Sequence, residues 1–537
     1  MAAPSPTVVV AALLDPTDWW GGSTVTYSTA TLGSVWTGYS SSGEPFSSGY
    51  QVLNTLQSAR VGVAAEAWDA LIRLNLNQTN DLIQPGQIRV GFSNVDDNSD
   101  EDIWGYAMMP PGSGGTGSSR AGDIWIDAAK SATAFTDGSY DYTALIHEFG
   151  HALGLKHPFE DGATLPGDYD TRRYTVMSYT NYTDDVYRTA EATATGVRTV
   201  VKAIYATTPM VYDVAAIQAR YGADTATAAG DTTYTWSQSQ PMMQTVYDAG
   251  GVDLIDLSTH TRSSIIDLTP GAYSSIDYFS AQAQAAYWTS LYPWAASFMS
   301  QQFEQASTYT WSNNLGIAFS TVIENVQAGS GADTVTGNAA ANNLNGGAGD
   351  DSLEGADGDD YLRGADGNDR IVGGSGFDDI NGNMGDDTAN GGLGSDWVVG
   401  GKDRDLLFGD DGDDIVYGNM GNDTLNGGAG DDIMRGGQDD DTLSGGAGDD
   451  WLSGDRGADT LSGGAGADVF HAGPGTGLDR ILDFSRAEGD RVQLDPGTAY
   501  TLSQQGADVD IDLGQGDHVL LVGVTLSSLG SGWIFGA

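Results

Sequence analysis

Two kinds of hydrophobic periodicity divide the chain. Between residues 51 and 74 apolar side chains recur near helical spacing, and the stretch DVAAIQARYG at 213–222 is a shorter amphipathic pattern that ends at glycine. Both patterns predict helices. QIRVGFS at 87–93 predicts a strand, and WGYAMMPP at 104–111 and GDIWID at 122–127 predict two more, joined by a Gly/Ser loop. Helices before and after a sheet indicate an α+β domain.

From residue 328 to residue 471 the pattern becomes a strict repeat of nine. Sixteen units fill these 144 residues without an insertion, as in GGAGDDSLE and GADGDDYLR. The first six residues of a unit predict a turn in which glycines supply positive φ and the sixth residue is usually aspartate. The eighth residue is apolar, as at Leu353 and Ile371, and we expect it to face a core. Two units would make one coil of an all-β parallel β-roll.

The sixth-position aspartates are candidate calcium ligands. Stacking of units 18 residues apart would bring pairs such as Asp351 and Asp369 to either side of one ion, and turn carbonyls would complete a shell of about six oxygens. We therefore expect several structural calcium ions. The candidate ligands are Asp351, Asp360, Asp369, Asp378, Asp387, Asp396, Asp405, Asp414, Asp423, Asp432, Asp441, Asp450 and Asp459.

Several positions depart from the repeat. Asn342 occupies the sixth position of the second unit, which predicts poor calcium binding by the first coil. Asp403 and Asp439 replace a fourth-position glycine, and Ala389 leaves a small core position. A flexible Gly/Asp linker is the alternative to a roll, and it applies without calcium, when thirty aspartates would repel one another. We expect a segment that folds when calcium binds.

The amino-acid composition limits which binding partners and which kinds of site this chain can have. The net charge is −51, from 63 Asp and ten Glu against 22 Lys and Arg. Asp is favoured in tight turns and as a calcium ligand, and so acidic a chain is unsuited to nucleic acid or an anionic membrane. The chain contains no cysteine, which excludes disulfides, thiolate zinc sites and a cysteine nucleophile. No run of apolar residues is long enough to span a membrane.

Three of the six histidines fall within YTALIHEFGHALGLKHP. His147 and His151 are four residues apart and share one helical face, Gly154 favours a helix end, and His157 can return as a third ligand. Three imidazoles leave one position open on a catalytic zinc. Glu148 would act as general base on a zinc-activated water and then pass the proton to a leaving amine. Ordinary surface histidines on a helix are the alternative.

YTVMSYT follows at 174–180. With HExxHxxGxxH before it, this stretch resembles the metzincin proteases, whose zinc motif is followed by a methionine-containing turn. Pro158, DVAAIQARYG, VYDAGGVDLIDLS and the calcium repeats make the chain similar to the serralysin family in particular. The resemblance implies one zinc on the three histidines, Glu148 as base and Met177 as the floor of the site. It also implies that Tyr179 can ligate the metal and stabilise the oxyanion of peptide hydrolysis.

The resemblance further implies a secreted, extracellular endopeptidase of broad specificity whose extended substrate adds a strand at the Trp104–Met109 edge. Serralysins leave the cell by a type I system without a cleaved N-terminal signal, which fits an N-terminus without a basic region. The C-terminal GSGWIFGA lacks the acidic residue found before the terminal hydrophobics of many relatives. Expected partners are protein substrates, type I secretion machinery and a proteinaceous inhibitor, and the expected state is a monomer.

We expect five regions along the chain: a candidate pro-segment at 1–17, a catalytic domain at 18–235, a connecting β region at 236–327, the calcium β-roll at 328–471, and a C-terminal β region with the export signal at 472–537. The aromatic-rich segment from Tyr278 to Trp311 resists assignment, and it is either an inert insertion or a cell-surface or partner site. A calcium-binding adhesion protein with a protease-like scaffold is the second functional hypothesis. A lipase is excluded because the chain has no GxSxG.

Overall fold

The computed structural model describes residues 3–34, 36, 50–94, 104–112, 120–160, 162–182 and 186–536. The chain forms two compact units. The first consists of Met1–Thr232, Ser237–Gly251 and Pro270–Val322, and the second of Thr233–Trp236, Val252–Thr269 and Ile323–Ala537. Residues 113–119 of the expected Gly/Ser loop lie outside the described residues.

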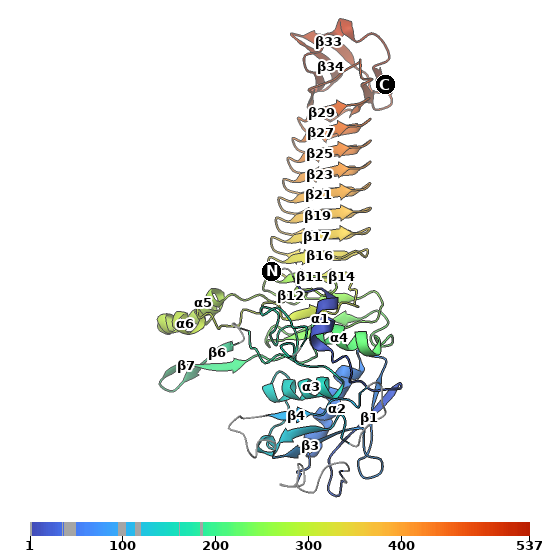
Figure 1. The fold of residues 1–537 in the computed structure, drawn as a ribbon. Helices are drawn as coiled ribbons and strands as arrows, with labels where there is room; N and C mark the ends of the chain where they lie inside the picture. Colours follow the sequence, from blue (N-terminus) through green and yellow to red (C-terminus); the bar gives the residue numbers. More distant parts are fainter. Residues whose placement is uncertain are drawn as a thin grey trace. The chain divides into compact units, whose positions relative to one another are not determined.

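A five-stranded sheet organises the first unit (Figure 1). Its order is β2-β1-β3-β5-β4, with β4 antiparallel to β5 and the other neighbours parallel. The three predicted strands are present as β3, β4 and β5, and β4 lies at an edge of the sheet. The strands are β1 (Thr24–Thr29), β2 (Asn75–Gln78), β3 (Ile88–Ser93), β4 (Gly105–Ala107) and β5 (Ile124–Asp127), and a short turn η1 (Ala128–Lys130) follows β5.

Two helices pack against this sheet, and α+β is confirmed as the class. Helix α2 (Thr55–Asp69) begins later than its apolar pattern, because Asn54 and Gln57 form a reciprocal capping box that sets the start. Helix α3 (Tyr140–Ala152) begins after Ser139, whose hydroxyl accepts the N–H of Tyr142.

Helices α1 (Pro6–Leu13) and α4 (Val211–Tyr221) pack together in the same unit. Helix α4 ends at Gly222, which has φ +78°. Val9, Ala12 and Leu13 of α1 are fully buried in the main core of the unit. The candidate pro-segment thus supplies part of this core, and its removal stays a prediction.

The rest of the first unit consists of short elements. A hairpin pairs β6 with β7, a three-stranded sheet has the order β12-β13-β9, and the aromatic segment left unassigned by its sequence forms two helices joined by a 3-10 turn. These elements are β6 (Val186–Thr193), β7 (Gly196–Ala203), β9 (Gln244–Val246), β12 (Tyr273–Ser274), α5 (Ala281–Leu291), η2 (Pro293–Ala295), α6 (Ala296–Phe303) and β13 (Leu315–Ile317).

The second unit is the predicted parallel β-roll (Figure 1). Consecutive strands alternate between two 13-stranded sheets, so each repeat strand pairs with the strand 18 residues further on, as Leu344 pairs with Leu362. Two nine-residue units therefore make one coil. The repeat strands are β16 (Asn343–Ala348), β17 (Ser352–Asp357), β18 (Tyr361–Asp366), β19 (Arg370–Ser375), β20 (Asp379–Met384), β21 (Thr388–Leu393), β22 (Trp397–Lys402), β23 (Leu406–Asp411), β24 (Ile415–Met420), β25 (Thr424–Ala429), β26 (Ile433–Gln438), β27 (Thr442–Ala447), β28 (Trp451–Arg456) and β29 (Thr460–Ala465).

Further strands extend the two sheets at both ends of the repeats. β8, β10 and β14 precede the repeats in one sheet and β11 and β15 in the other. They are β8 (Thr233–Tyr234), β10 (Leu254–Asp256), β11 (Ile265–Asp267), β14 (Asn325–Gln327), β15 (Thr334–Thr336), β30 (Val469–Ala472), β31 (Leu478–Ile481), β32 (Arg491–Leu494), β33 (Thr501–Gln505), β34 (Asp508–Gly514), β35 (Asp517–Leu521), η3 (Leu526–Ser528) and β36 (Ile534–Phe535).

The eighth residue of each unit lies in the core of the roll, as the pattern predicts. Leu353 and Ile371 are fully buried, and so is the small Ala389. Asp403 and Asp439 adopt the positive φ of the glycines that they replace, at 74° and 75°. Short polar side chains tolerate this conformation, so the register continues through both positions. Among the described residues, no helix is long and apolar enough to cross a membrane.

Candidate active site

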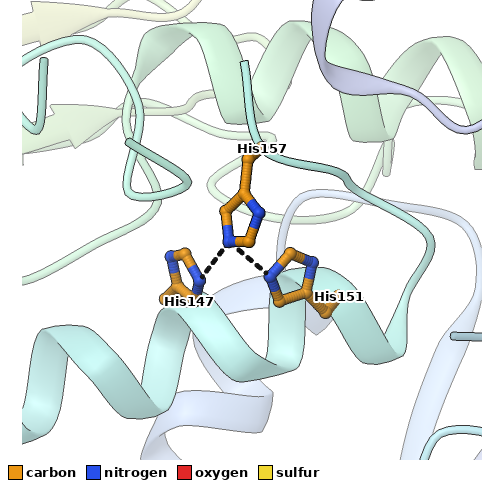
Figure 2. A group of neighbouring side chains, drawn as sticks. All are labelled: His147, His151 and His157. Atoms are coloured by element: carbon orange, nitrogen blue, oxygen red, sulfur yellow. Dashed lines mark hydrogen bonds between the residues drawn. The ribbon is translucent and has the colours of Figure 1, made fainter. Parts of the chain in front are cut away.

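Helix α3 and the turn after it bring the three histidines together (Figure 2). His147 and His151 point from one face of α3, and His157 returns over them. The Nε2 atom of His157 lies 3.0 Å from that of His151 and 3.3 Å from that of His147. Gly154 makes the return possible, because it has φ +101° and a Cβ there would lie 2.5 Å from the Asp18 carbonyl oxygen.

The outer nitrogen of each ring faces an acceptor. His147 Nδ1 lies 2.7 Å from the Val176 carbonyl oxygen and His151 Nδ1 lies 2.8 Å from that of Leu155. His157 Nδ1 lies 2.5 Å from a carboxylate oxygen of Glu160. Since carbonyl and carboxylate oxygens only accept, each Nδ1 holds the ring proton and each Nε2 presents a lone pair.

Three lone pairs at this separation repel one another unless a cation lies between them. Ligand nitrogens about 2.1 Å from a tetrahedral zinc lie roughly 3.4 Å apart, close to the two spacings between the Nε2 atoms. A metal-ligating imidazole usually donates its other ring N–H to a carbonyl or carboxylate oxygen, as each Nδ1 does here. The donor set therefore fits zinc.

Burial keeps the imidazoles of His147 and His151 neutral. Burial, and then the neighbouring His151, lower the pKa of His147 well below its usual value. Burial, and then His157, lower the pKa of His151 to about 4. Neutral imidazoles are the form that binds a metal, so near pH 7 no proton need be displaced from His147 or His151.

Glu148 is buried beside His147, and its Oε2 atom has no hydrogen-bond partner in the described part of the chain. Burial raises the pKa of Glu148 to about 8, and the backbone N–H of Ala107 opposes the shift. A buried, unpartnered carboxyl oxygen with a raised pKa is suited to take up a proton near neutral pH. A cation held by the histidines would lower this pKa again.

Tyr179 lies over the histidines. Its ring centroid is 4.5 Å from that of His157 and 5.6 Å from that of His147, and the residue is 58% exposed. Partial burial, and then the Glu148 carboxylate, raise the pKa of Tyr179 to about 12. The phenol is therefore protonated at neutral pH and can donate a hydrogen bond.

Met177 lies under α3, where it is fully buried. A Cβ added at Gly150, within the histidine motif, would be 2.6 Å from the Met177 sulfur. The glycine between the two helical histidines thus admits the methionine beneath them. The motif spacing alone does not show this contact.

Two carboxylates that sequence reasoning missed support the histidines. Asp213 is fully buried and accepts the backbone N–H groups of Val176 and Met210, each at 2.8 Å, and the Thr175 hydroxyl. Burial raises the pKa of Asp213 to about 7 against these three donors. Glu160 is the second, through its contact with His157. Asp213 belongs to the predicted DVAAIQARYG helix, but nothing in its spacing to the histidines signals the contact.

Two cavities flank Glu148 and Tyr179 along the edge strand β4. One, of about 460 Å³, is lined by Trp104, Tyr140 and Val176 among others, and the second, of about 700 Å³, by Ala107 and Met109 among others. Gly105 and Tyr106 of β4 border both cavities. The edge strand of the sheet therefore passes directly beside the histidines.

In the roll, the sixth-position aspartates form two ladders, one in each row of turns. One carboxylate oxygen of each accepts a backbone N–H from the coil before it, as Asp369 Oδ1 does from Asp351 N at 2.8 Å. The second oxygen is buried and has no hydrogen-bond partner among the described residues. This holds for the thirteen predicted ligands and for one more, Asp468, which sequence reasoning left out.

Those unpartnered oxygens lie in small cradles of oxygen atoms. A Cβ added at Gly346 would lie 2.3 Å from Asp351 Oδ2 and 2.9 Å from the Gly364 carbonyl oxygen. Burial raises the pKa of Asp351 to about 7 and that of Asp405 to about 8. Buried carboxylate and carbonyl oxygens around a gap that only glycine leaves open are a fitting donor set for calcium.

The first coil differs from the others. Asn342 Oδ1 accepts the N–H of Asn338 at 2.8 Å, and Asn342 Nδ2 donates to the Glu324 carbonyl oxygen at 3.0 Å. Both ends of this amide are satisfied by protein atoms. The coil therefore needs no ion at this position.

Comparison with known proteins matches the N-terminal part of the chain and the repeats to two different families. Residues 48–189 match the Matrixin family of peptidases, and segments between 327 and 478 match the RTX calcium-binding nonapeptide repeat. A metallopeptidase AprA of Pseudomonas marginalis is 29% identical over 252 residues, which are 43% of this chain and 50% of the relative. A serralysin of Proteus mirabilis is 28% identical over 251 residues, 42% of this chain and 48% of the relative.

A metalloprotease AprA of Pseudomonas entomophila is 29% identical over 314 residues, 54% of this chain and 55% of the relative. The chain spans about half the length of these curated relatives. Fold, histidine site and matches define a metallopeptidase-type domain followed by calcium-binding repeats. More narrowly, the chain is similar to serralysin-type metzincins with RTX repeats. The Matrixin domain implies zinc, and the repeats imply calcium.

Proposed function

We propose that this chain is a secreted zinc endopeptidase that calcium folds and stabilises. The observation that carries the proposal is the convergence of three Nε2 lone pairs beside the unpartnered Oε2 atom of Glu148. His147, His151 and His157 would hold one zinc ion. A zinc ion there would supply a Lewis acid for the carbonyl of the cleaved bond and for water.

Glu148 acts as the general base. Its free oxygen takes a proton from the attacking water, the water oxygen bonds to the peptide carbonyl carbon, and Glu148 returns the proton to the amine as the C–N bond breaks. The Tyr179 phenol donates a hydrogen bond to the oxyanion that develops on the carbonyl. Met177 supports the histidines from below.

An extended substrate adds as a strand along β4. Antiparallel addition directs its residues before the cleaved bond toward the Ala107 end and those after the bond toward the Trp104 end. Side chains on the two sides then occupy the two cavities. Main-chain pairing makes few sequence demands, so many unfolded proteins are expected substrates.

Calcium holds the roll together in this proposal. The predicted aspartate ligands and Asp468 would bind on the order of a dozen ions. Export by type I machinery, an extracellular location, a proteinaceous inhibitor, a monomeric state and a removable pro-segment belong to the same proposal. The resemblance to serralysins supports them.

The test is cleavage of unfolded casein in millimolar calcium by the parent chain and Glu148→Ala, with Glu66→Ala, an exposed glutamate of α2, as control. We expect Glu148→Ala to lower kcat/KM by about 100-fold or more while zinc content and circular dichroism stay unchanged. Glu66→Ala should match the parent. Substantial activity in Glu148→Ala would exclude Glu148 as the base. A parent that binds both metals and cleaves nothing would favour either a latent precursor or the adhesion hypothesis, and removal of residues 1–17 would distinguish them.

A further inference from the structure

The segment from Tyr278 to Phe303 has no part in the histidine site or in the calcium repeats. Its 26 residues contain eight aromatic side chains and no Asp, Glu, Lys, Arg or His, although 18% of the chain is Asp, Glu, Lys or Arg. At that frequency a segment of this length would contain four or five charges. Packing within the first unit alone does not explain why an exposed segment lacks charged residues. We therefore ask which of its side chains are exposed.

The inner side of α5 is packed. Ala285 is buried in a small cluster with Met299 and Phe303 of α6, and Trp288 and Tyr292 cover that cluster. Gln284 is buried too, and its amide donates to the carbonyl oxygens of Phe279 and Tyr309, each at 2.7 Å.

The hairpin β6–β7 completes this support. Ala190 belongs to the same buried cluster, Val197 packs on it, and the Thr199 hydroxyl donates to the Gln302 side chain. Figure 1 shows α5 and α6 side by side, with β6 and β7 beside them. The helices are therefore held in place, and their outer side chains are presented by a fixed scaffold.

The outer side of α5 is apolar and exposed. Tyr287 is 49% exposed, Leu291 52% and Trp294, in η2, 68%. Tyr287 and Leu291 are four residues apart and lie on one face of α5, and Trp294 follows in η2, after the helix has ended at Tyr292. The segment contains no charged side chain that would make this exposed surface hydrophilic.

We propose that the exposed side chains of Tyr287, Leu291 and Trp294 insert into the interfacial layer of a zwitterionic lipid bilayer. Trp and Tyr are enriched at that depth, where the ring is buried and its polar atom stays hydrated. A protein-binding surface more often includes arginine among its aromatic residues, and this segment contains none; exposed charges lie on the supporting hairpin, as at Glu191 and Arg198.

Charge selects the kind of bilayer. A chain with a net charge of −51 is repelled by anionic headgroups, whereas an uncharged element can approach zwitterionic ones. Three side chains give weak, reversible attachment, in contrast to a spanning helix. This inference is independent of the proposed peptidase activity.

The experiment is flotation of the full chain with phosphatidylcholine vesicles in millimolar calcium. The test variant carries Leu291→Asp and Trp294→Ala. Its matched control carries Ile433→Asp and Trp397→Ala, which change an exposed aliphatic and an exposed tryptophan of the roll, at 42% and 41% exposure. Casein cleavage or circular dichroism confirms that each variant is folded.

We expect the parent and control to float and the test variant to lose about fivefold or more of its bound fraction. A parent that does not float overturns the proposal, and so does an equal loss in both variants. The alternative is that these side chains bind a second copy of this chain. Light scattering tests it by measuring the mass of the protein in solution. A parent dimer that becomes monomeric only in the test variant would also overturn the proposal.

Discussion

The buried carboxylate of Asp213 accepts the backbone N–H of Val176 at 2.8 Å, and the carbonyl of that same Val176 faces His147 Nδ1 at 2.7 Å. One carboxylate on α4 therefore fixes the peptide that orients a histidine on α3. Residues 66 positions apart in sequence are coupled through a single backbone segment.

Asp213→Asn should weaken this coupling. The NH2 group of the asparagine would face one of the three groups that donate hydrogen bonds to the Asp213 carboxylate. The Val176 peptide would then hold His147 less firmly, so zinc affinity should fall by about tenfold. The free energy of unfolding should fall by about 2 kcal/mol. Asp224→Asn is the control, because Asp224 accepts Thr227 in a turn and contacts no histidine. Zinc competition against a chelator measures the effect, and equal affinities for the two variants would contradict it.

Gly154→Ala should destabilise the first unit more than Gly162→Ala does. Both glycines have nearly the same φ, +101° and +102°, so both variants suffer the left-handed strain of about 1 kcal/mol. Only at Gly154 does the new Cβ also meet backbone, the Asp18 carbonyl oxygen at 2.5 Å; at Gly162 nothing lies within 4 Å. Thermal unfolding in calcium compares them. Equal shifts in Tm would show that the Asp18 contact is readily relieved.

Without calcium, the roll should be more stable in mild acid than at pH 8. Burial raises the pKa of Asp405 and of Asp441 to about 8, from about 3.9 for an aspartate in an unfolded chain. Between these values the folded roll binds more protons than the unfolded chain, so its free energy of unfolding falls as pH rises. Circular dichroism in chelator should show more β structure at pH 5 than at pH 8.

Saturating calcium should remove this dependence, because the ions then neutralise the carboxylates near pH 8. A chelated chain whose β content rises with pH instead would contradict the assignment of these buried aspartates. The pH titration is made at constant ionic strength, so that a change in the screening of charge repulsion by salt does not contribute to the change in β content.

Asp405→Asn should raise the calcium concentration needed to fold the roll, since it removes one charge from a buried donor set. Asp411→Asn removes the same charge from an exposed position in the following unit and is the matched control. We expect a midpoint about threefold higher for Asp405→Asn, and almost no change for Asp411→Asn. Equal midpoints would indicate that net charge, rather than the sixth-position oxygens, controls folding.

Local patterns were sufficient for much of this protein. A period of nine with an apolar eighth residue admits only a coil of two units, so the roll, its register and the row of buried aspartates follow from the sequence. Helical spacing likewise placed His147 and His151 on one face, and glycine after them allowed the return of His157. These features depend on residues close together in the chain.

Features that depend on distant packing could not be read in this way. The sequence of residues 1–17 does not show that Val9 and Leu13 of α1 lie in the core of the first unit. The segment from Tyr278 to Trp311 had no clear period, because α5 is apolar on its buried and exposed sides alike. Asp213 lies 66 residues after His147, so only tertiary packing brings it to the histidine site, whereas Glu160 contacts His157 three residues away through the local turn.

The sequence by itself thus determined the metal-binding residue types, their spacing and the solenoid, because each arises from short-range backbone geometry. Only the tertiary structure decided which carboxylates orient the histidines, which strand edge passes beside them and which aromatic face remains exposed. Those outcomes depend on burial and on contacts between segments far apart in the chain, and neither is encoded in a local pattern.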